Sequence, residues 1–116
     1  LTYIQHFVKV FMAMTIKETI LEEAQNIVHS SRMKDYGTPL DNHTLTAELF
    51  SAYLGVPITA EQVCYLNILQ KISRSVHSFK RDNLVDIAGY TYNLQMIQDE
   101  RELTYDLARR KDENDG

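Results

Sequence analysis

The chain has 116 residues, of which 44% are hydrophobic and 24% are charged, and both values are typical of one soluble globular domain. Twelve Lys and Arg against sixteen Asp and Glu give a formal net charge of -4, which argues against a protein that binds duplex nucleic acid. The single cysteine, Cys64, excludes a disulfide framework and a cysteine-based zinc cluster. Four Gly and two Pro leave little material for tight β-turns, so we expect a mostly helical intracellular domain.

The beginning of the chain is apolar and aromatic, and Lys9 is the only formal charge in residues 1–13. This run is shorter than the roughly 20 residues that span a bilayer, and it lacks the pattern of a secretory signal. We expect residues 1–14 to be an extension with one of three roles. It packs on a neighbour, anchors the protein at a membrane surface, or precedes a natural start at Met14. Packing or an upstream origin is favoured over contact with a membrane.

Apolar residues at spacings of three and four predict four helices, at 15–30, 43–54, 60–77 and 83–105. Two of them begin with capping boxes, Thr15 with Glu18 and Thr59 with Gln62. The short link between the last two predicts that they are antiparallel neighbours. We therefore expect an all-α fold, a compact and oligomeric four-helix bundle spanning residues 15–105, with the N-terminal extension as an additional element. The polar residues 106–116 predict a flexible charged tail.

The apolar faces of these helices predict the core. Its expected members are Leu45, Leu49, Phe50 and Tyr53 on the second helix, Val63, Leu66, Leu69, Ile72 and Val76 on the third, and Leu84, Ile87, Ala88, Thr91, Leu94 and Ile97 on the fourth. Cys64 is expected to be a small buried hydrophobic residue rather than a nucleophile.

Two polar stripes follow the third and fourth helices. They consist of Asn67, Lys71 and Arg74, continued by Lys80 and Arg81 in the link, and of Asp82, Asp86, Tyr90 and Asn93. In an antiparallel pair, Lys71 and Arg74 can face the two aspartates in a ladder of ion pairs that fixes the register of the helices. Alternatively, the basic residues and the start of the fourth helix bind a phosphate-bearing ligand, and Asp82 and Asp86 hold Mg²⁺ with phosphate oxygens.

A long loop at residues 30–42 is the second candidate region. Arg32 and Lys34 supply positive charge, Arg32 suits bidentate binding of phosphate, and Tyr36 can stack on a base. The alternative is an ordinary turn in which Tyr36 fills the space between helices. The four histidines, His6, His29, His43 and His77, show no metal-ligand spacing, and most are expected at the surface or at helix caps.

Two motifs carry a family resemblance: R-x-K-D-Y-G-x-P at residues 32–39 and K-R-D-N-L-V-D-I-A-G-Y at residues 80–90. Together with L-E-E-A before the first motif and S-A-Y-L-G-V-x-I-T between them, they resemble a small all-helical family encoded largely by bacteriophages and prophages. The resemblance covers about residues 16–98. It implies a helical fold and a protein that acts in the cytoplasm of an infected or lysogenic bacterium.

A more distant similarity is to the MazG-like nucleotide pyrophosphohydrolases, which hold Mg²⁺ with E-E-x-x-E on one helix and E-x-x-D on another. Asn83 and Asp86 stand in place of the second motif, whereas Glu22 and Glu23 are followed by Asn26 where the first motif has its third glutamate. Asn67, Lys71 and Arg74 are also similar in part to a helix of a phage nucleotide-kinase family. Both similarities imply nucleotides as ligands.

Three functions follow from these observations. The first is binding of a nucleotide or nucleotide-derived ligand, including sequestration of a defence signal without turnover. Its expected ligand-binding residues are Arg32, Lys34, Tyr36, Asn67, Lys71, Arg74, Lys80, Arg81, Asn83 and Tyr90. The second is a Mg²⁺-dependent nucleoside triphosphate pyrophosphohydrolase with Asp82 and Asp86 at the metal, together with Glu22 or Glu23 as a further ligand. The third is a protein–protein interaction module, most simply a homo-oligomer.

Overall fold

The computed structural model describes residues 2–115, apart from the side chains of residues 15 and 16, and every regular element in this range is a helix. The predicted all-α class is therefore confirmed. The helices are α1 (Tyr3–Ile16), α2 (Ile20–Val28), α3 (Arg32–Tyr36), α4 (Pro39–Leu54), α5 (Ala60–Ser75) and α6 (Arg81–Asp115). In the described part of the chain, none of them is long and apolar enough to cross a membrane.

The first predicted helix is divided in the structure. Two T-I-x-E sequences follow one another, and only the second caps a helix: the Thr19 hydroxyl accepts from the Glu22 backbone N–H at 3.1 Å, and the Glu22 carboxylate accepts from the Thr19 N–H at 3.1 Å. The capping role predicted for Thr15 is wrong, because this residue lies inside α1. The third predicted helix is confirmed, with Thr59 and Gln62 as its capping box.

The region between α2 and α4 is more ordered than the sequence predicted. The expected loop contains the short helix α3, and α4 begins at Pro39 rather than at residue 43. Thr38 caps α4 by accepting from the Asp41 N–H at 3.2 Å, and Pro39 at the first helical position has no N–H to leave unpaired. At the other end of the chain, α6 continues to Asp115, so residues 106–115 are helical where a frayed tail was predicted.

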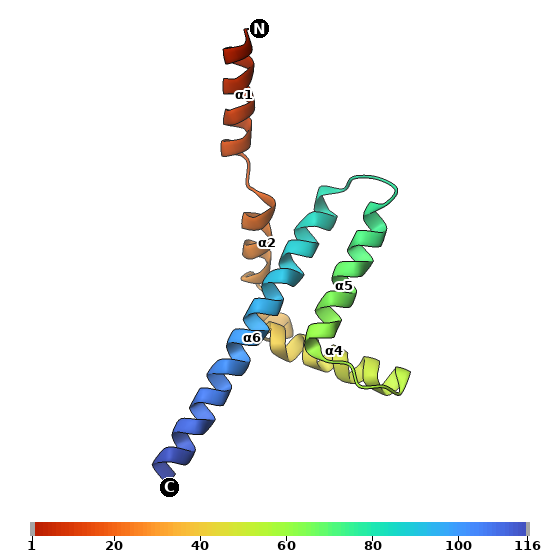
Figure 1. Ribbon diagram of the computed structural model, residues 1–116, viewed down its shortest axis with the longest axis vertical. Coiled ribbons are helices and arrows are strands. Elements are labelled where there is room, and N and C mark those ends of the chain that lie inside the picture. The colour runs from red at the N-terminus through yellow and green to blue at the C-terminus, as the bar shows by residue number, and fades with distance from the viewer. Residues whose placement is uncertain (1, 116) are drawn as a thin grey trace.

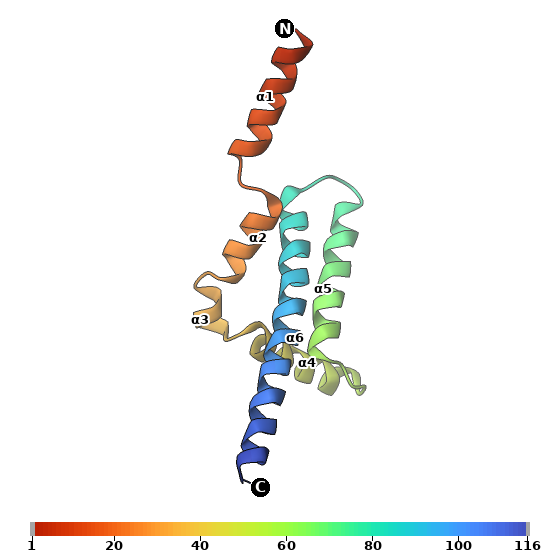
Figure 2. The ribbon, with the colours of Figure 1, turned by 60° about the vertical axis from the view of Figure 1, so that its left-hand side comes forward.

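The long helix α6 organises the fold (Figure 1). α5 runs antiparallel to it, α2 lies along its N-terminal half, and α4 crosses the lower end of α5 (Figures 1 and 2). α1 projects away and packs against no other helix of the described chain. The extents of 73 × 39 × 22 Å and a radius of gyration of 19.7 Å, against about 13 Å for a compact chain of this length, do not confirm the predicted compact four-helix bundle.

The buried core is small. Its members are Ala24, Ala47, Ala60, Val63, Cys64, Val85 and Ile97, and Leu40 and Leu94 pack against the part formed by Ala60, Cys64 and Ile97. Burial of Val63, Cys64 and Ile97 confirms the sequence prediction. Several other expected core residues are exposed: Leu45, Leu49, Phe50 and Tyr53 of α4, Leu66, Leu69 and Ile72 of α5 with Val76 at its C-cap, and Thr91 of α6. The reason is geometric, because α4 and α5 each bury one apolar face and carry a second one.

Candidate functional site

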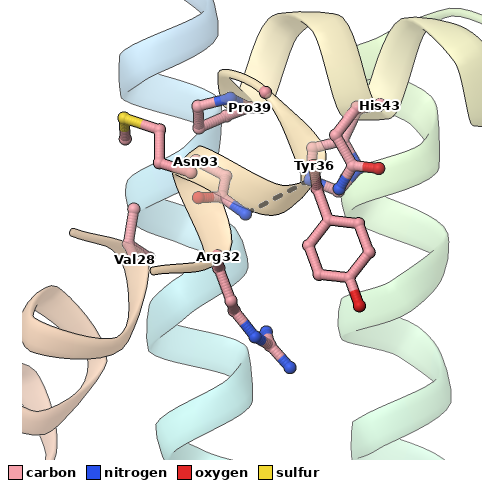
Figure 3. Close-up of a pocket in the computed structure, with 9 residues that line it drawn as sticks. Val28, Arg32, Tyr36, Pro39, His43 and Asn93 are labelled. Carbon is pink, nitrogen blue, oxygen red and sulfur yellow. Dashed lines mark hydrogen bonds between the residues drawn. The ribbon is translucent and has the colours of Figure 1, made fainter. Parts of the chain in front are cut away.

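A pocket of about 260 Å³ lies where α2, α3, α4 and α6 meet, and we call it the α3 pocket. It is lined by Val28, Arg32, Met33, Tyr36, Gly37, Pro39, Asn42, His43 and Asn93 (Figure 3). Arg32 and Tyr36 stand four residues apart on α3 and extend to the same side of the pocket. The pocket therefore combines a guanidinium group, an aromatic ring and three polar side chains from other helices.

The turn after α3 depends on Gly37. Its φ of +80° and ψ of −170° lie in a region open almost only to glycine. A Cβ at this position would also lie 3.2 Å from the Asp41 Cβ and 3.3 Å from its Oδ2. The chain can therefore turn sharply from α3 into the Thr38 cap of α4, which places Tyr36 and His43 on one pocket.

His43 and Asn93 form the buried polar wall of the pocket. Asn93 Nδ2 lies 3.2 Å from His43 Nε2, and the His43 ring meets the Tyr90 ring edge to face at a centroid distance of 6.2 Å. Burial lowers the pKa of His43 below its ordinary value of 6.5, so the neutral ring is favoured, and its Nε2 can accept from the amide. The other amide atom, Asn93 Oδ1, is buried and has no hydrogen-bond partner in the described chain.

A second, smaller hollow of about 40 Å³ adjoins the α3 pocket, with which it shares Val28, Arg32 and Asn93. Asp86 and Tyr90 contribute to its lining. The Asp86 carboxylate also accepts from Lys71 Nζ of α5 at 2.7 Å, as the ladder interpretation of the two polar stripes predicted. The structure thus connects Arg32, Tyr36, Tyr90, Asp86 and Lys71 in one continuous region.

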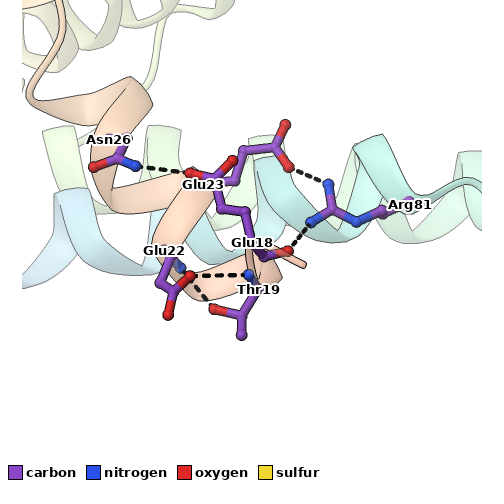
Figure 4. Close-up of polar contacts among 6 residues, drawn as sticks. All are labelled: Glu18, Thr19, Glu22, Glu23, Asn26 and Arg81. Atoms are coloured by element: carbon purple, nitrogen blue, oxygen red, sulfur yellow. Dashed lines mark hydrogen bonds and ion pairs between the residues drawn. The ribbon is translucent and has the colours of Figure 1, made fainter. Parts of the chain in front are cut away.

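Arg81 has a different place. Its guanidinium forms an ion pair with the Glu23 carboxylate and donates to the Glu18 carbonyl oxygen at 2.9 Å (Figure 4). These contacts attach the start of α6 to the N-terminal turn of α2. Glu22 is likewise used in the Thr19 cap, so both carboxylates of the first MazG-like motif have structural partners (Figure 4).

The remaining expected site residues line neither hollow: Lys34, Asn67, Arg74, Lys80, Asp82 and Asn83. Lys34, Arg74, Lys80 and Asp82 are exposed, and Asn67 is half-buried on α5. Asn83 is buried, and its Nδ2 has no hydrogen-bond partner within the described residues. Over residues 2–115, no group of three or more His, Cys, Asp or Glu side chains is arranged to hold a metal ion.

Sequence reasoning missed His43, Asn93 and Asn42 as site residues. His43 is 5% exposed, so the expectation of a surface or capping role fails for this histidine. Asn93 continues the polar stripe of Asp86 and Tyr90 by three residues, and this spacing was the available signal. No signal marked His43, because its partner lies fifty residues away in sequence.

These observations define an all-helical protein whose candidate site is a polar pocket beside the short helix α3. The chain belongs to the family described as a domain of unknown function, DUF6378, whose model matches residues 19–98. This range contains α2 to α5, the first half of α6 and the whole α3 pocket.

Two bacteriophage proteins are similar to this chain. The Gene 55 protein of Mycobacterium phage D29 is 42% identical over 86 residues, which cover 73% of this chain and 57% of the relative. The Gene 55 protein of Mycobacterium phage L5 is 40% identical over 88 residues, which cover 72% of this chain and 56% of the relative. The chain thus spans little more than half the length of these relatives, and they support the predicted connection with bacteriophages. No solved structure matches it.

Proposed function

We propose that this protein binds a nucleotide or a related phosphate-bearing ligand in the α3 pocket. The observation that carries the proposal is that Arg32 and Asn93 line one pocket, and that the buried Oδ1 of the Asn93 amide has no partner in the described chain. A buried unsatisfied polar atom costs about 1–3 kcal/mol, and an N–H or amino group of a ligand would remove that cost. The base of a nucleotide supplies such a donor, and the phosphate group of the nucleotide supplies the anion for Arg32.

The size and chemistry of the pocket support the same ligand class. Its volume of about 260 Å³ lies just below the roughly 300–1,000 Å³ typical of small-molecule sites, which suits a mononucleotide more than a dinucleotide. Tyr36 is exposed at the pocket and offers a ring on which a base can stack. Neutral His43 and Asn42 supply further polar groups that can fix the orientation of the base.

We further propose retention of the ligand rather than its hydrolysis, as in sequestration of a nucleotide signal of the bacterial defence response. This part of the proposal is supported by the structural roles of the carboxylates, since Glu22 caps α2, Glu23 pairs with Arg81 and Asp86 pairs with Lys71. The alternative is the Mg²⁺-dependent pyrophosphohydrolase, in which Asp82 and Asp86 hold the metal. The two functions differ in whether pyrophosphate is released.

The binding test compares two cations of the same short helix. Calorimetric titration with a panel of nucleoside mono-, di- and triphosphates identifies the ligand, and Arg32→Gln should weaken its binding by roughly tenfold or more. Lys34→Gln is the matched control, because Lys34 is exposed and lies outside the pocket lining. Equal affinity of the two variants, or no binding by any member of the panel, would overturn the proposed site.

The turnover test incubates the bound nucleotide with the protein and Mg²⁺ and measures released pyrophosphate. We expect the nucleotide to be recovered intact. Release of pyrophosphate that Asp86→Asn abolishes would contradict retention and support the hydrolase alternative. This result would not change the conclusion on the binding site at Arg32, which the binding test decides.

A further inference from the structure

Helix α5 is apolar on two opposite faces. Ala60, Val63 and Cys64 are buried on the side of the core. The opposite side carries a set that we call the α5 outer stripe: Tyr65, Leu66, Leu69, Ile72 and Val76, the last at the C-cap, all between 45% and 74% exposed. An exposed row of large apolar side chains along one face of a helix is typical of a surface that contacts a partner.

The α5 outer stripe is uncharged. The positive charge of Lys71 lies on the α6 side of the helix, where its ammonium group pairs with Asp86 at 2.7 Å. A second copy of the stripe can therefore pack on it without burying an unpaired charge, which would be costly. Since the stripe contains no charge, it also has no feature that would select a partner of opposite charge.

α4 shows the same two-sided pattern. His43 and Ala47 are buried on one face, whereas Leu45, Leu49 and Tyr53 are exposed on the other at spacings of four residues. Two adjoining helices thus carry unpaired apolar faces. Exposed apolar residues in rows along a helix mark interaction sites more often than scattered single residues do.

The accessible surface indicates how much area a partner has to cover. The chain exposes 9083 Å², whereas a compact monomer of 13.5 kDa exposes about 6,500 Å². The projecting α1 and the end of α6 account for part of the excess, which is on the order of 2,500 Å². Obligate homodimers bury roughly 2,000–5,000 Å² in total over both chains. One protomer of such a dimer buries half of this area, roughly 1,000–2,500 Å², and the excess is large enough to include it.

We propose that the α5 outer stripe packs against the same stripe of a second copy of this chain, so that the two α5 helices form the centre of a dimer. A two-fold axis brings identical patches together, and an uncharged apolar stripe is complementary to itself. Within one chain, α6 packs antiparallel on the other side of α5 (Figure 1), so the two α6 helices lie outside the paired α5 helices. The ligand proposal is independent, because the α3 pocket includes no residue of α5.

Oligomeric state in solution tests the proposal with two matched leucines. Leu69 in the stripe is 59% exposed and Leu103 on the far part of α6 is 60% exposed. Light scattering during size-exclusion chromatography should give the full chain twice the mass of one protomer. Leu69→Lys should shift the mass toward the monomer, and Leu103→Lys should leave it unchanged. A monomeric wild-type chain, or a Leu69→Lys variant that stays dimeric, would overturn the proposal.

A crosslinking experiment keeps the test decisive if Leu69→Lys fails to fold, which circular dichroism would reveal. Ile72→Cys places a thiol near the centre of the stripe, and a short bis-maleimide should join it to its own copy. Native Cys64 is buried and its pKa is raised to about 11, so it contributes little background. Leu103→Cys is the control. A dimer in which Leu103→Cys crosslinks and Ile72→Cys does not would show that another surface forms the interface.

Discussion

Asn93 Nδ2 on α6 lies 3.2 Å from His43 Nε2 on α4, and this contact joins two helices in the wall of the α3 pocket. For the amide to donate, the imidazole has to be neutral, with its proton on Nδ1. The contact also leaves Asn93 Oδ1 on the other side of the amide, buried and without a partner in the described chain. The same pair of residues therefore couples the stability of the fold, the protonation of His43 and the acceptor that we assign to a ligand.

The stability of the protein should fall as the pH falls below about 6.5, through His43. Burial lowers the pKa of His43 in the folded state, so the unfolded chain binds the proton first, and the free energy of unfolding decreases between the ordinary pKa and the folded pKa. The limiting slope for one proton is about 1.4 kcal/mol per pH unit. Urea unfolding at a series of pH values measures it.

The control for this prediction is a second histidine. His43→Gln should remove a large part of the pH dependence on the acid side of 6.5, whereas His77→Gln, at an exposed position after α5, should preserve it. If the two variants lose stability with falling pH in the same way as the wild type, the buried imidazole is not the group that titrates.

Arg81 should contribute to stability and not to ligand binding, although the sequence placed it among the ligand-binding residues. Its ion pair with Glu23 and its bond to the Glu18 carbonyl attach α6 to α2. A cation at a helix N-terminus is itself unfavourable by some tenths of a kcal/mol, and the two contacts have to exceed that cost. We expect Arg81→Gln to lower the free energy of unfolding by about 1 kcal/mol, measured by urea unfolding.

The neighbouring Lys80 is the matched control for Arg81. Lys80 is exposed immediately before α6, so Lys80→Gln should change the free energy of unfolding by less than about 0.5 kcal/mol. Calorimetric titration of both variants with the nucleotide should give the wild-type affinity. Weaker binding by Arg81→Gln at unchanged stability would return Arg81 to the ligand site.

Local signals in the sequence predicted the helices well where they were unique. The Thr59–Gln62 capping box begins α5 as expected. The two successive T-I-x-E sequences satisfied the same rule, and only the presence of α1 as a separate helix decides that Thr19, not Thr15, is the cap. Local patterns therefore predict that a helix is present. The residue at which it begins depends on whether the preceding residues belong to another helix.

Burial was harder to predict, for a physical reason. Periodicity shows that Val63 and Leu69 both belong to apolar faces of α5, but it does not say which face is covered within one chain. The same limit applies to the site. Arg32 and Tyr36 were predicted because one loop contains both, whereas the His43–Asn93 contact exists only after α4 and α6 have packed.

Among the glycines that the structure describes, Gly37 should be the most sensitive to substitution, and Gly55 provides its control. Both have positive φ, +80° and +72°, but Gly55 has left-handed helical ψ and open space for a Cβ, whereas Gly37 has a ψ of −170° and Asp41 within 3.2 Å. Gly37→Ala should therefore lower the free energy of unfolding by roughly 2–4 kcal/mol, and Gly55→Ala by about 1 kcal/mol, as measured by urea unfolding.

Because Gly37 also lines the α3 pocket, Gly37→Ala should weaken nucleotide binding at temperatures where the variant is still folded, and Gly55→Ala should not. Equal losses of stability in the two variants would mean that the turn after α3 relaxes around the added methyl group, and that the position of Tyr36 does not depend on this glycine.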